Sequence, residues 1–449
     1  MLFLLLACTG PEPEPAPQPT VEVEARRALV LVTLDTTRAD ALGVYGGPEG
    51  ASPVFDRLAS EGVRFEWAIS HVPTTLSSHA SMMTGLDPHG HAIPRNGYPL
   101  ADEIDTLAER LSAAGWDTRA VVAASAVDTT TNLQQGFAAY DDQLGIDKGK
   151  RYEARGDDVT RRAFASVDAS QADKPLFLWV HYYDAHTPYE APKEFRSRWT
   201  DPKMRGRFGK PGGAAERAAE LFRAGQLDEQ GQAAFRALYQ AEVAYADDQL
   251  GQLLAGLDER GLQATVVVTA DHGEMFFEDR SSPVGHGTEV DLPITHVPLV
   301  VHGPGIQPGV VDTPVRLSDV GPTLLGLAGL PSQLGTGQDL GPALRGEPIQ
   351  ANPAFLEATK PKRNEQPPAW NNLYNERGVV DQGHVLLSKR GRERLYLLEE
   401  GQPSATDSQV QESLGEKLEA WDANAPEWRP ETMTDEVRAA LEALGYLDE

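Results

Sequence analysis

Unbroken apolar runs recur along the chain, and each is bounded by polar or turn-forming residues. Most of the runs are rich in valine and leucine and show no alternation of apolar and polar positions. This pattern is typical of strands that are buried on both faces of a parallel sheet. It predicts strands at 28–34, 118–123, 176–181, 264–269 and 297–301.

Amphipathic segments lie between these strands and predict helices. Ser52 followed by Pro53 is a helix start and Gly62 is a stop, so a short helix is expected between them. A long helix is expected at 229–260, where apolar residues recur at steps of three and four. Alternating strands and helices predict an α/β sandwich with a large, mostly parallel central sheet and helices on both faces.

The pattern changes near residue 342. A small antiparallel sheet and a terminal helix are predicted there, with strands at 354–357, 378–388 and 394–398 and the helix at 433–444. We therefore expect a main domain over 28–341 and a small C-terminal subdomain over 342–449.

Composition narrows the range of functions. The chain has 449 residues, a formal net charge of −27 and a single cysteine, Cys8. A lone thiol excludes an internal disulfide, a cysteine-based zinc site and a two-cysteine redox pair. An acidic protein is a poor partner for nucleic acid, because phosphate binding depends on clustered Lys and Arg. Long-range repulsion of polyanions favours a small or lipid-embedded substrate over a highly charged polymer.

The N-terminus resembles the lipobox of bacterial lipoproteins. Residues 5–8 read LLAC, and in that family the cysteine, here Cys8, carries the lipid. The preceding run lacks a basic start, so either translation begins further upstream or the match is fortuitous. The Pro/Glu-rich segment 9–27 favours the first alternative, since it would stay extended as a tether. We expect an extracytoplasmic bacterial lipoprotein, anchored to a membrane on the periplasmic side or to the outer membrane, with its signal and lipobox in residues 1–8.

Four polar clusters stand where the predicted strands end or a helix begins. They comprise Asp35, the segment 74–79, Asp184 with His186, and Asp271-His272-Gly273-Glu274 with His286 further on. Polar residues at the carboxyl ends of parallel strands meet at one edge of an open α/β sheet. Two carboxylates and an imidazole from separate strand ends are a suitable donor set for a divalent cation.

Several longer stretches stand in one order along the chain. They are LVTLDTTRAD, SPVFDRLASEG, SSHASMMTG, YYDAHTPY, YQAEVAYADDQLG, TADHGE and HVPLVVHGPG, with ALGYLD near the end. In this order they resemble the sulfatase family of the alkaline-phosphatase superfamily. The resemblance runs from about residue 28 to the end and implies a sulfatase-like sandwich fold and a hydrolase of sulfuric or phosphoric esters.

Three departures separate the chain from typical sulfatases. In typical sulfatases, the first residue of a C/S-x-P-S-R segment is oxidised to formylglycine. When residues 78–81 (SHAS) are aligned with the S-R-A-x that ends this motif, Thr75 takes the position of the oxidised residue. Threonine cannot become formylglycine. Thr36 replaces the usual second aspartate after the first strand, and no segment matches the family's G-K-W-H.

The chain is therefore more similar to the threonine-nucleophile relatives, the nucleotide pyrophosphatase/phosphodiesterases and lipoteichoic acid synthases. The ligands of one divalent metal ion (Zn, Mn or Ca) carry over to Asp35, Thr75, Asp271 and His272. The resemblance places Asn96 on a phosphoryl oxygen. Candidates for a second metal site are Asp184, His186 and His286. In single-metal members, the same histidines contact the substrate instead.

The polar clusters and the family resemblance together predict a metal-dependent hydrolase with a covalent intermediate on Thr75. A bound dication lowers the pKa of a coordinated hydroxyl by several units, and a helix N-terminus adds to this effect. Transferring oxygens would be stabilised by His79, His186, His286 and Asn96, and one histidine could protonate the leaving group. The alternatives are a phosphotransferase acting on envelope lipids or polymers, and a non-catalytic binding protein that kept the fold.

Simpler interpretations stay open for single residues. Thr75 could only cap its helix, His79 could face solvent, and Asn96 could be a turn residue. His89 and His91 lie in a turn-rich segment and are expected to be structural.

Overall fold

The computed structural model describes residues 25–144, 153–359, 369–399 and 407–427. Cys8, the lipobox segment 1–8, most of the tether and the predicted helix at 433–444 lie outside the described residues. Within the described part of the chain, no helix is both long and apolar enough to cross a membrane.

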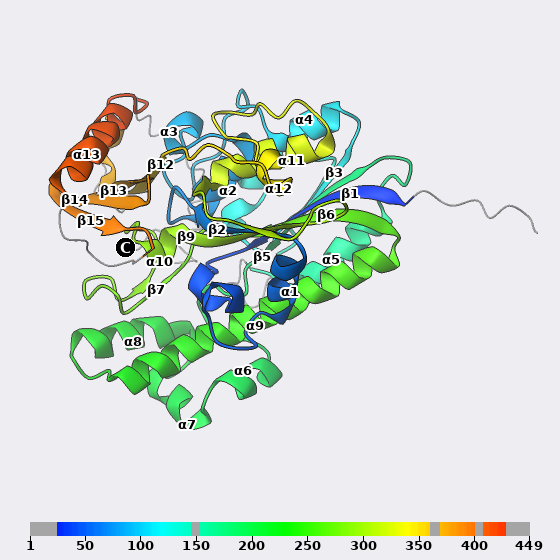
Figure 1. The fold of residues 1–449 in the computed structure, drawn as a ribbon. Coiled ribbons are helices and arrows are strands. Elements are labelled where there is room, and N and C mark those ends of the chain that lie inside the picture. Colours follow the sequence, from blue (N-terminus) through cyan, green and yellow to red (C-terminus); the bar gives the residue numbers. More distant parts are fainter. Residues whose placement is uncertain (1–24, 145–152, 360–368, 400–406, 428–449) are drawn as a thin grey trace, which may run out of the picture.

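A mixed nine-stranded sheet forms the centre of the molecule (Figure 1). Its strands are β1 (Arg26–Leu34), β2 (Val63–Ile69), β3 (Asp117–Val121), β4 (Ala139–Asp141), β5 (Leu176–Tyr182), β6 (Leu262–Thr269), β9 (His296–His302), β10 (Gly309–Val311) and β11 (Val315–Arg316). They follow the order β10-β2-β9-β6-β1-β5-β3-β4, and β11 also pairs with β2. Only β9 runs antiparallel to its neighbours β2 and β6. The predicted large, mostly parallel sheet is confirmed.

Helices cover both faces of this sheet. On one face lie α1 (Pro53–Glu61), α5 (Gly156–Asp168) and α9 (Glu229–Glu259), and on the other α2 (Thr75–Thr84), α4 (Leu107–Ala113), α11 (Val320–Ala328) and α12 (Gly341–Leu344). Alternate residues of β1 join the two cores, Val30 and Val32 on the first face and Leu29 and Leu31 on the second. Burial of both faces explains the unbroken apolar run of this strand.

Shorter elements surround the two helical layers. They are α3 (Pro88–His91), α6 (Lys193–Trp199), α7 (Pro202–Arg205), α8 (Ala214–Arg223), α10 (Leu292–Thr295) and the β7–β8 pair (Met275–Phe276, Val284–Gly285). The predicted long helix is confirmed as α9, which begins after the capping side chain of Asp228. Asp247 joins α9 to α1, because its carboxylate accepts hydrogen bonds from the amides of Val54 and Phe55 at 2.9 and 2.8 Å.

The C-terminal part forms a separate antiparallel sheet. It consists of β12 (Ala354–Thr359), β13 (Tyr374–Asp381), β14 (His384–Lys389) and β15 (Arg392–Leu397), and α13 (Ser408–Asp422) packs against it. The predicted strand region 378–388 is a hairpin, turning at Gln382-Gly383, where both residues have positive φ. His89 stacks on Trp421 with ring centroids 3.6 Å apart, which supports its structural role.

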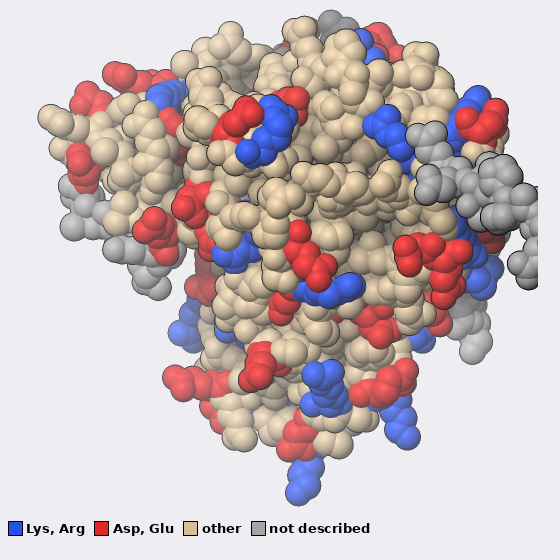
Figure 2. All heavy atoms as spheres, turned by 45° about the vertical axis from the view of Figure 1, so that its right-hand side comes forward, with Lys and Arg blue, Asp and Glu red and all other residues tan. Residues whose placement is uncertain are grey.

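Acidic and basic side chains are interspersed on the face shown in Figure 2. Red and blue residues alternate there and do not separate into one acidic and one basic half. The expectation that the chain does not bind nucleic acid stays a prediction.

Candidate active site

Asp35 and Asp271 emerge at the same edge of the sheet, because they follow adjacent parallel strands. The pairing of β1 with β6 sets Thr33 beside Thr269, two residues before each aspartate. Asp35, Asp271 and His272 are at most 1% exposed and offer ligand atoms within 4.8 Å of one another. Among the residues that the structure describes, this is the only such group of three or more His, Cys, Asp or Glu side chains.

Each of the three side chains is held through one atom and leaves another atom unpaired. Asp271 Oδ1 accepts hydrogen bonds from the amides of Thr36 and His272 at 3.1 and 2.8 Å. His272 Nδ1–H donates to the Gly273 carbonyl at 3.0 Å, which leaves a lone pair on Nε2. Asp35 Oδ1, Asp271 Oδ2 and His272 Nε2 are buried and make no hydrogen bond. This donor set fits a divalent cation.

The electrostatics of the group also favour a cation. Burial and the negative charge of Asp271 raise the pKa of Asp35 well above its usual range. His272 Nε2 lies 3.4 Å from Asp271 Oδ2, so two electron-rich atoms face each other. A cation bound between these groups would offset the free-energy cost of burying the two carboxylates and would also offset their mutual repulsion.

Thr75 is the first residue of α2, and its side chain is fully buried beside Asp35. Its hydroxyl faces the Asp35 carboxylate and opposes part of the rise in the pKa of that carboxyl, but the two groups do not meet in regular hydrogen-bond geometry. Thr74 holds the N-cap position, so the interpretation of Thr75 as the helix cap is wrong. The N-terminal end of the helix dipole favours negative charge on the hydroxyl.

Asn96 lies next to Thr75. Its Oδ1 accepts a hydrogen bond from the amide of Leu76 at 2.8 Å, and the residue is 5% exposed. Its Nδ2 group is buried and has no acceptor. A turn residue would not need a buried, unpaired amide, whereas an oxygen of a bound ester would satisfy it.

His181 supports Asp35 and was not recognised from the sequence. Its Nδ1 accepts from the amide of Ala123 at 3.4 Å, so Nε2 carries the proton and donates to Asp35 Oδ2 at 3.2 Å. The only sign of this role in the sequence is a polar residue inside the apolar run LFLWVHY. The strand register sets the partner, because it pairs Thr33 with His181.

His79 differs from both sequence-based expectations. It is fully buried, so it does not face solvent. Its Nδ1 bonds the Thr75 carbonyl at 2.7 Å and its Nε2 the Thr33 hydroxyl at 3.0 Å. Burial lowers its pKa to about 3, so the ring is neutral. Because both nitrogens are engaged within the protein, His79 supports α2 beneath the site and offers no hydrogen bond to transferring oxygens.

His286 and His186 extend the site beyond His272. The rings of His272 and His286 are 4.4 Å apart, and those of His286 and His186 are 5.0 Å apart. Glu274 Oε1 lies 3.2 Å from His286 Nδ1, and the Tyr189 hydroxyl donates to Glu274 Oε2 at 3.3 Å. Burial raises the pKa of Glu274 to about 7 and lowers those of His186 and His286 to about 3 and 4. Glu274 belongs to the DHGE segment that the sequence singled out, but the sequence alone did not reveal that it contacts His286.

The second metal site is not assembled. Asp184 Oδ1 accepts a hydrogen bond from the amide of Gly156 at 2.9 Å, so Asp184 holds the first residue of α5. In the described part of the chain, Asp184 does not form a ligand group with His186 and His286. His286 and His186 lie near His272, but Asp184 does not join them.

Asp35, Asp271 and His272, with Thr75 beside them, thus gather at the carboxyl edge of a mostly parallel α/β sheet, the usual place of the active site in enzymes with open α/β folds. The family model described as Sulfatase matches residues 27–330. The chain belongs to the sulfatase family. The family resemblance of the sequence motifs is thereby confirmed, and so is the expected hydrolase at the level of the family.

Two curated relatives illustrate the similarity. The ulvan-active sulfatase of Formosa agariphila is 27% identical over 354 residues, which cover 72% of this chain and 66% of that protein. The arylsulfatase of Clostridium perfringens is 24% identical over 362 residues, which cover 67% of this chain and 74% of that protein. The chain thus spans about two thirds of the first relative's length.

A solved structure shows the same fold. The phosphonate monoester hydrolase of Agrobacterium radiobacter superposes with a TM-score of 0.70 at 21% identity, covering 90% of this chain and 96% of that one. At this level of identity, the likeness concerns the fold.

Proposed function

We propose that this chain hydrolyses organic sulfate or phosphate esters with a bound divalent cation, through a covalent ester on Thr75. The observation that carries the proposal is a set of four buried side-chain atoms without hydrogen-bond partners, contributed by Asp35, Thr75, Asp271 and His272. Each unpaired buried polar group costs about 1–3 kcal/mol, so a purely structural site would pair them. One cation with oxygen and nitrogen ligands would satisfy the whole set.

The chain's own residues would carry the reaction. When bound, the cation would supply positive charge and lower the pKa of the Thr75 hydroxyl. The Thr75 hydroxyl gives up its proton as Oγ1 bonds to the sulfur or phosphorus atom, and the bond to the leaving oxygen breaks as that oxygen takes up a proton. Water then attacks the same centre, the bond to Thr75 breaks to release the acid anion, and a proton from the water restores the Thr75 hydroxyl.

The residues around Thr75 would complete the site. Asn96, positioned by the Leu76 amide, donates to an oxygen of the transferring group. His286, held by Glu274, lies with His186 on the side where substrate oxygens would be stabilised. Thr75 and the missing G-K-W-H segment favour phosphate over sulfate esters.

A substrate panel tests this function. Purified protein is assayed with added Mn²⁺, Zn²⁺ or Ca²⁺ against an aryl sulfate, an aryl phosphate, a phosphodiester and a phosphonate monoester. Turnover of at least one ester that stops on chelation and returns when the metal is restored supports the proposal. A protein that binds no divalent ion and turns over none of them would instead be a binding protein that kept the fold.

Replacing Asn96 with alanine is expected to lower kcat/KM by about a hundredfold, because one donor to the developing negative charge is lost. Asn132→Ala is a matched control, since Asn132 donates to the Leu100 carbonyl and to Asp102 outside the site. Steady-state kinetics of both variants should separate them. If kcat/KM falls equally in both variants, Asn96 has no specific role in the reaction.

We also propose that Cys8 carries a lipid anchor, supported by the lipobox-like residues 5–8 and the Pro/Glu-rich tether. The protein expressed in a bacterial host with an upstream signal is expected to enter the detergent phase on partition. Cys8→Ser should move it to the aqueous phase. Wild-type protein found in the aqueous phase would refute the anchor.

A further inference from the structure

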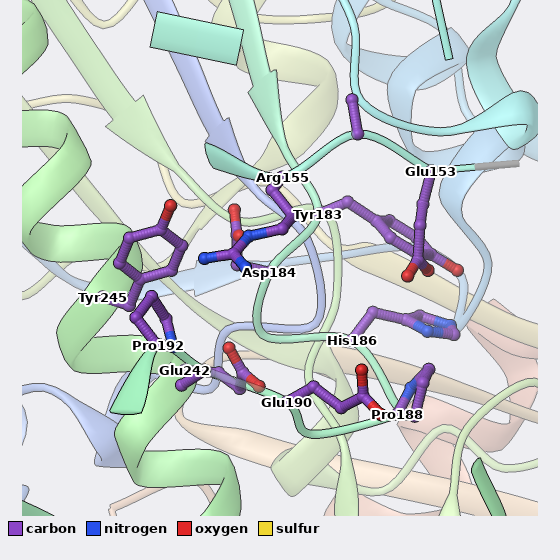
Figure 3. A pocket seen from close by; sticks show the side chains of 12 residues that line it. Glu153, Arg155, Tyr183, Asp184, His186, Pro188, Glu190, Pro192, Glu242 and Tyr245 are labelled. Carbon is purple, nitrogen blue, oxygen red and sulfur yellow. The ribbon is translucent and has the colours of Figure 1, made fainter. Parts of the chain in front are cut away.

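A small acidic pocket adjoins the site at His186 (Figure 3). It lies between the segment after β5, the start of α5 and helix α9, and its cavity volume is about 50 Å³. His186 lines the pocket, and its ring is 5.0 Å from that of His286. One imidazole therefore separates the pocket from the residues beside the proposed metal ligands.

The walls of the pocket carry more negative than positive charge. The ionisable carboxyl and guanidinium side chains are those of Glu153, Asp184, Glu190, Glu242 and Arg155. Glu242 is only 3% exposed. Asp184 Oδ2 and Glu242 Oε1 are buried, and neither has a hydrogen-bond partner. These two oxygens are the atoms that a ligand would satisfy.

The surroundings of the two carboxylates compensate this charge only in part, because Arg155 and the backbone amides near Glu242 favour the ionised forms less than burial disfavours them. Burial raises the pKa of Asp184 to about 7. Burial and the negative charge of Asp184 raise the pKa of Glu242 well above its usual range. Arg155 packs over the Tyr245 ring and lies 3.6 Å from Asp157, and it makes no hydrogen bond to Asp184 Oδ2. Buried carboxylates without such a partner are stabilised by a cation.

We propose that this pocket binds the ammonium group of an amine-bearing ester, with Asp184 and Glu242 as its carboxylate partners. An ammonium group has three donors, enough for both unpaired oxygens. The inference rests on the proposed function, because it names the leaving group as an amino alcohol.

The size and ligand geometry of the pocket favour an ammonium group over other occupants. A volume of about 50 Å³ is enough for a small cationic group. A bare divalent ion would need clustered ligand atoms, and in the described part of the chain the only such cluster is Asp35, Asp271 and His272. Because the rings of His286 and His186 lie between His272 and the pocket, at successive spacings of 4.4 and 5.0 Å, the leaving alcohol needs a chain of several carbon atoms between its oxygen and its nitrogen.

The test compares two esters of similar size, a 6-aminohexyl ester and a heptyl ester of the same acid, in the metal-loaded protein. We expect the ratio of their kcat/KM values to favour the amine by roughly tenfold or more. Glu242→Gln and Asp184→Asn remove one charge each with little change in shape and are expected to bring the ratio down toward one. Asp248→Asn, on the exposed side of α9, is the matched control and should leave the ratio unchanged.

The outcomes separate this inference from the proposed function. Turnover of both esters with no preference for the amine, or a preference that survives Glu242→Gln and Asp184→Asn, overturns the ammonium site and leaves the hydrolase intact. If no ester is turned over, calorimetry with the 6-aminohexyl ester decides. Binding that is lost in Glu242→Gln supports the site, and absence of binding to the wild-type protein refutes it.

Discussion

Replacing Thr75 with alanine is expected to lower kcat/KM by about a thousandfold or more, with the fold intact. The substitution removes the only atom proposed to attack the substrate. Because this hydroxyl is buried and unpaired, its removal leaves no broken hydrogen bond. The metal-free variant should therefore unfold only a few degrees below the metal-free wild type, and the small loss comes from the buried methyl group that alanine also lacks.

Two further variants make this result specific. Thr75→Ser keeps a hydroxyl at the same position and should retain activity within about tenfold of wild type. Thr84→Ala, at the other end of α2, removes a hydroxyl that bonds the Ala80 carbonyl and should not change the kinetics. If Thr75→Ala hydrolyses the best substrate of the panel as fast as the wild type, Thr75 is not the nucleophile.

Replacing Asp271 with asparagine is expected to weaken binding of the divalent cation by about a hundredfold and to abolish turnover at low metal concentration. The variant keeps an oxygen that can accept from the amides of Thr36 and His272, but it loses a charged ligand. A cation that binds only the folded state raises stability in proportion to the logarithm of its concentration. The metal-dependent rise in unfolding temperature should largely disappear.

Asp247→Asn is the matched control for this measurement. Asp247 is also a buried aspartate that accepts two backbone hydrogen bonds, but its partners are at the start of α1. The control should unfold at a lower temperature than the wild type and still gain stability from added metal. Both variants are measured by calorimetry with and without metal. If added metal raises the unfolding temperature of Asp271→Asn as much as that of the wild type, Asp271 is not a ligand.

Much of the fold was predictable because burial leaves a direct pattern in the sequence. The five predicted strands correspond to β1, β3, β5, β6 and β9, since strands covered on both faces carry apolar residues at nearly every position. The grouping of Asp35 with Asp271 and His272 was also predictable, because parallel strands end at one edge of a sheet.

The supporting contacts of the site were not predictable in the same way. His181 bonds Asp35 only because the register of β1 and β5 pairs Thr33 with His181. The role of His79 was mistaken because its partners, the Thr33 hydroxyl and the Thr75 carbonyl, come from a strand and from its own helix turn. Which hydrogen-bond partner a buried histidine finds depends on tertiary geometry rather than on residue type or spacing.

The expectation for Asp184 failed for a related reason. Its position two residues before His186 suggested a shared metal ion, but the turn after β5 sends its carboxylate to the start of α5. Short spacing along a loop does not set the direction of side chains. The same turn places Asp184 in the pocket with Glu242, a residue 58 positions further along the chain.

The most direct test of the central claim is mass spectrometry of the metal-loaded protein, quenched with acid during turnover of the best substrate of the panel. The account predicts one added phosphoryl or sulfo group on the peptide that contains Thr75, located on Thr75 by fragmentation and absent from Thr75→Ala. Full turnover by the wild type with the group on another residue, or an added group that persists in Thr75→Ala, would contradict it.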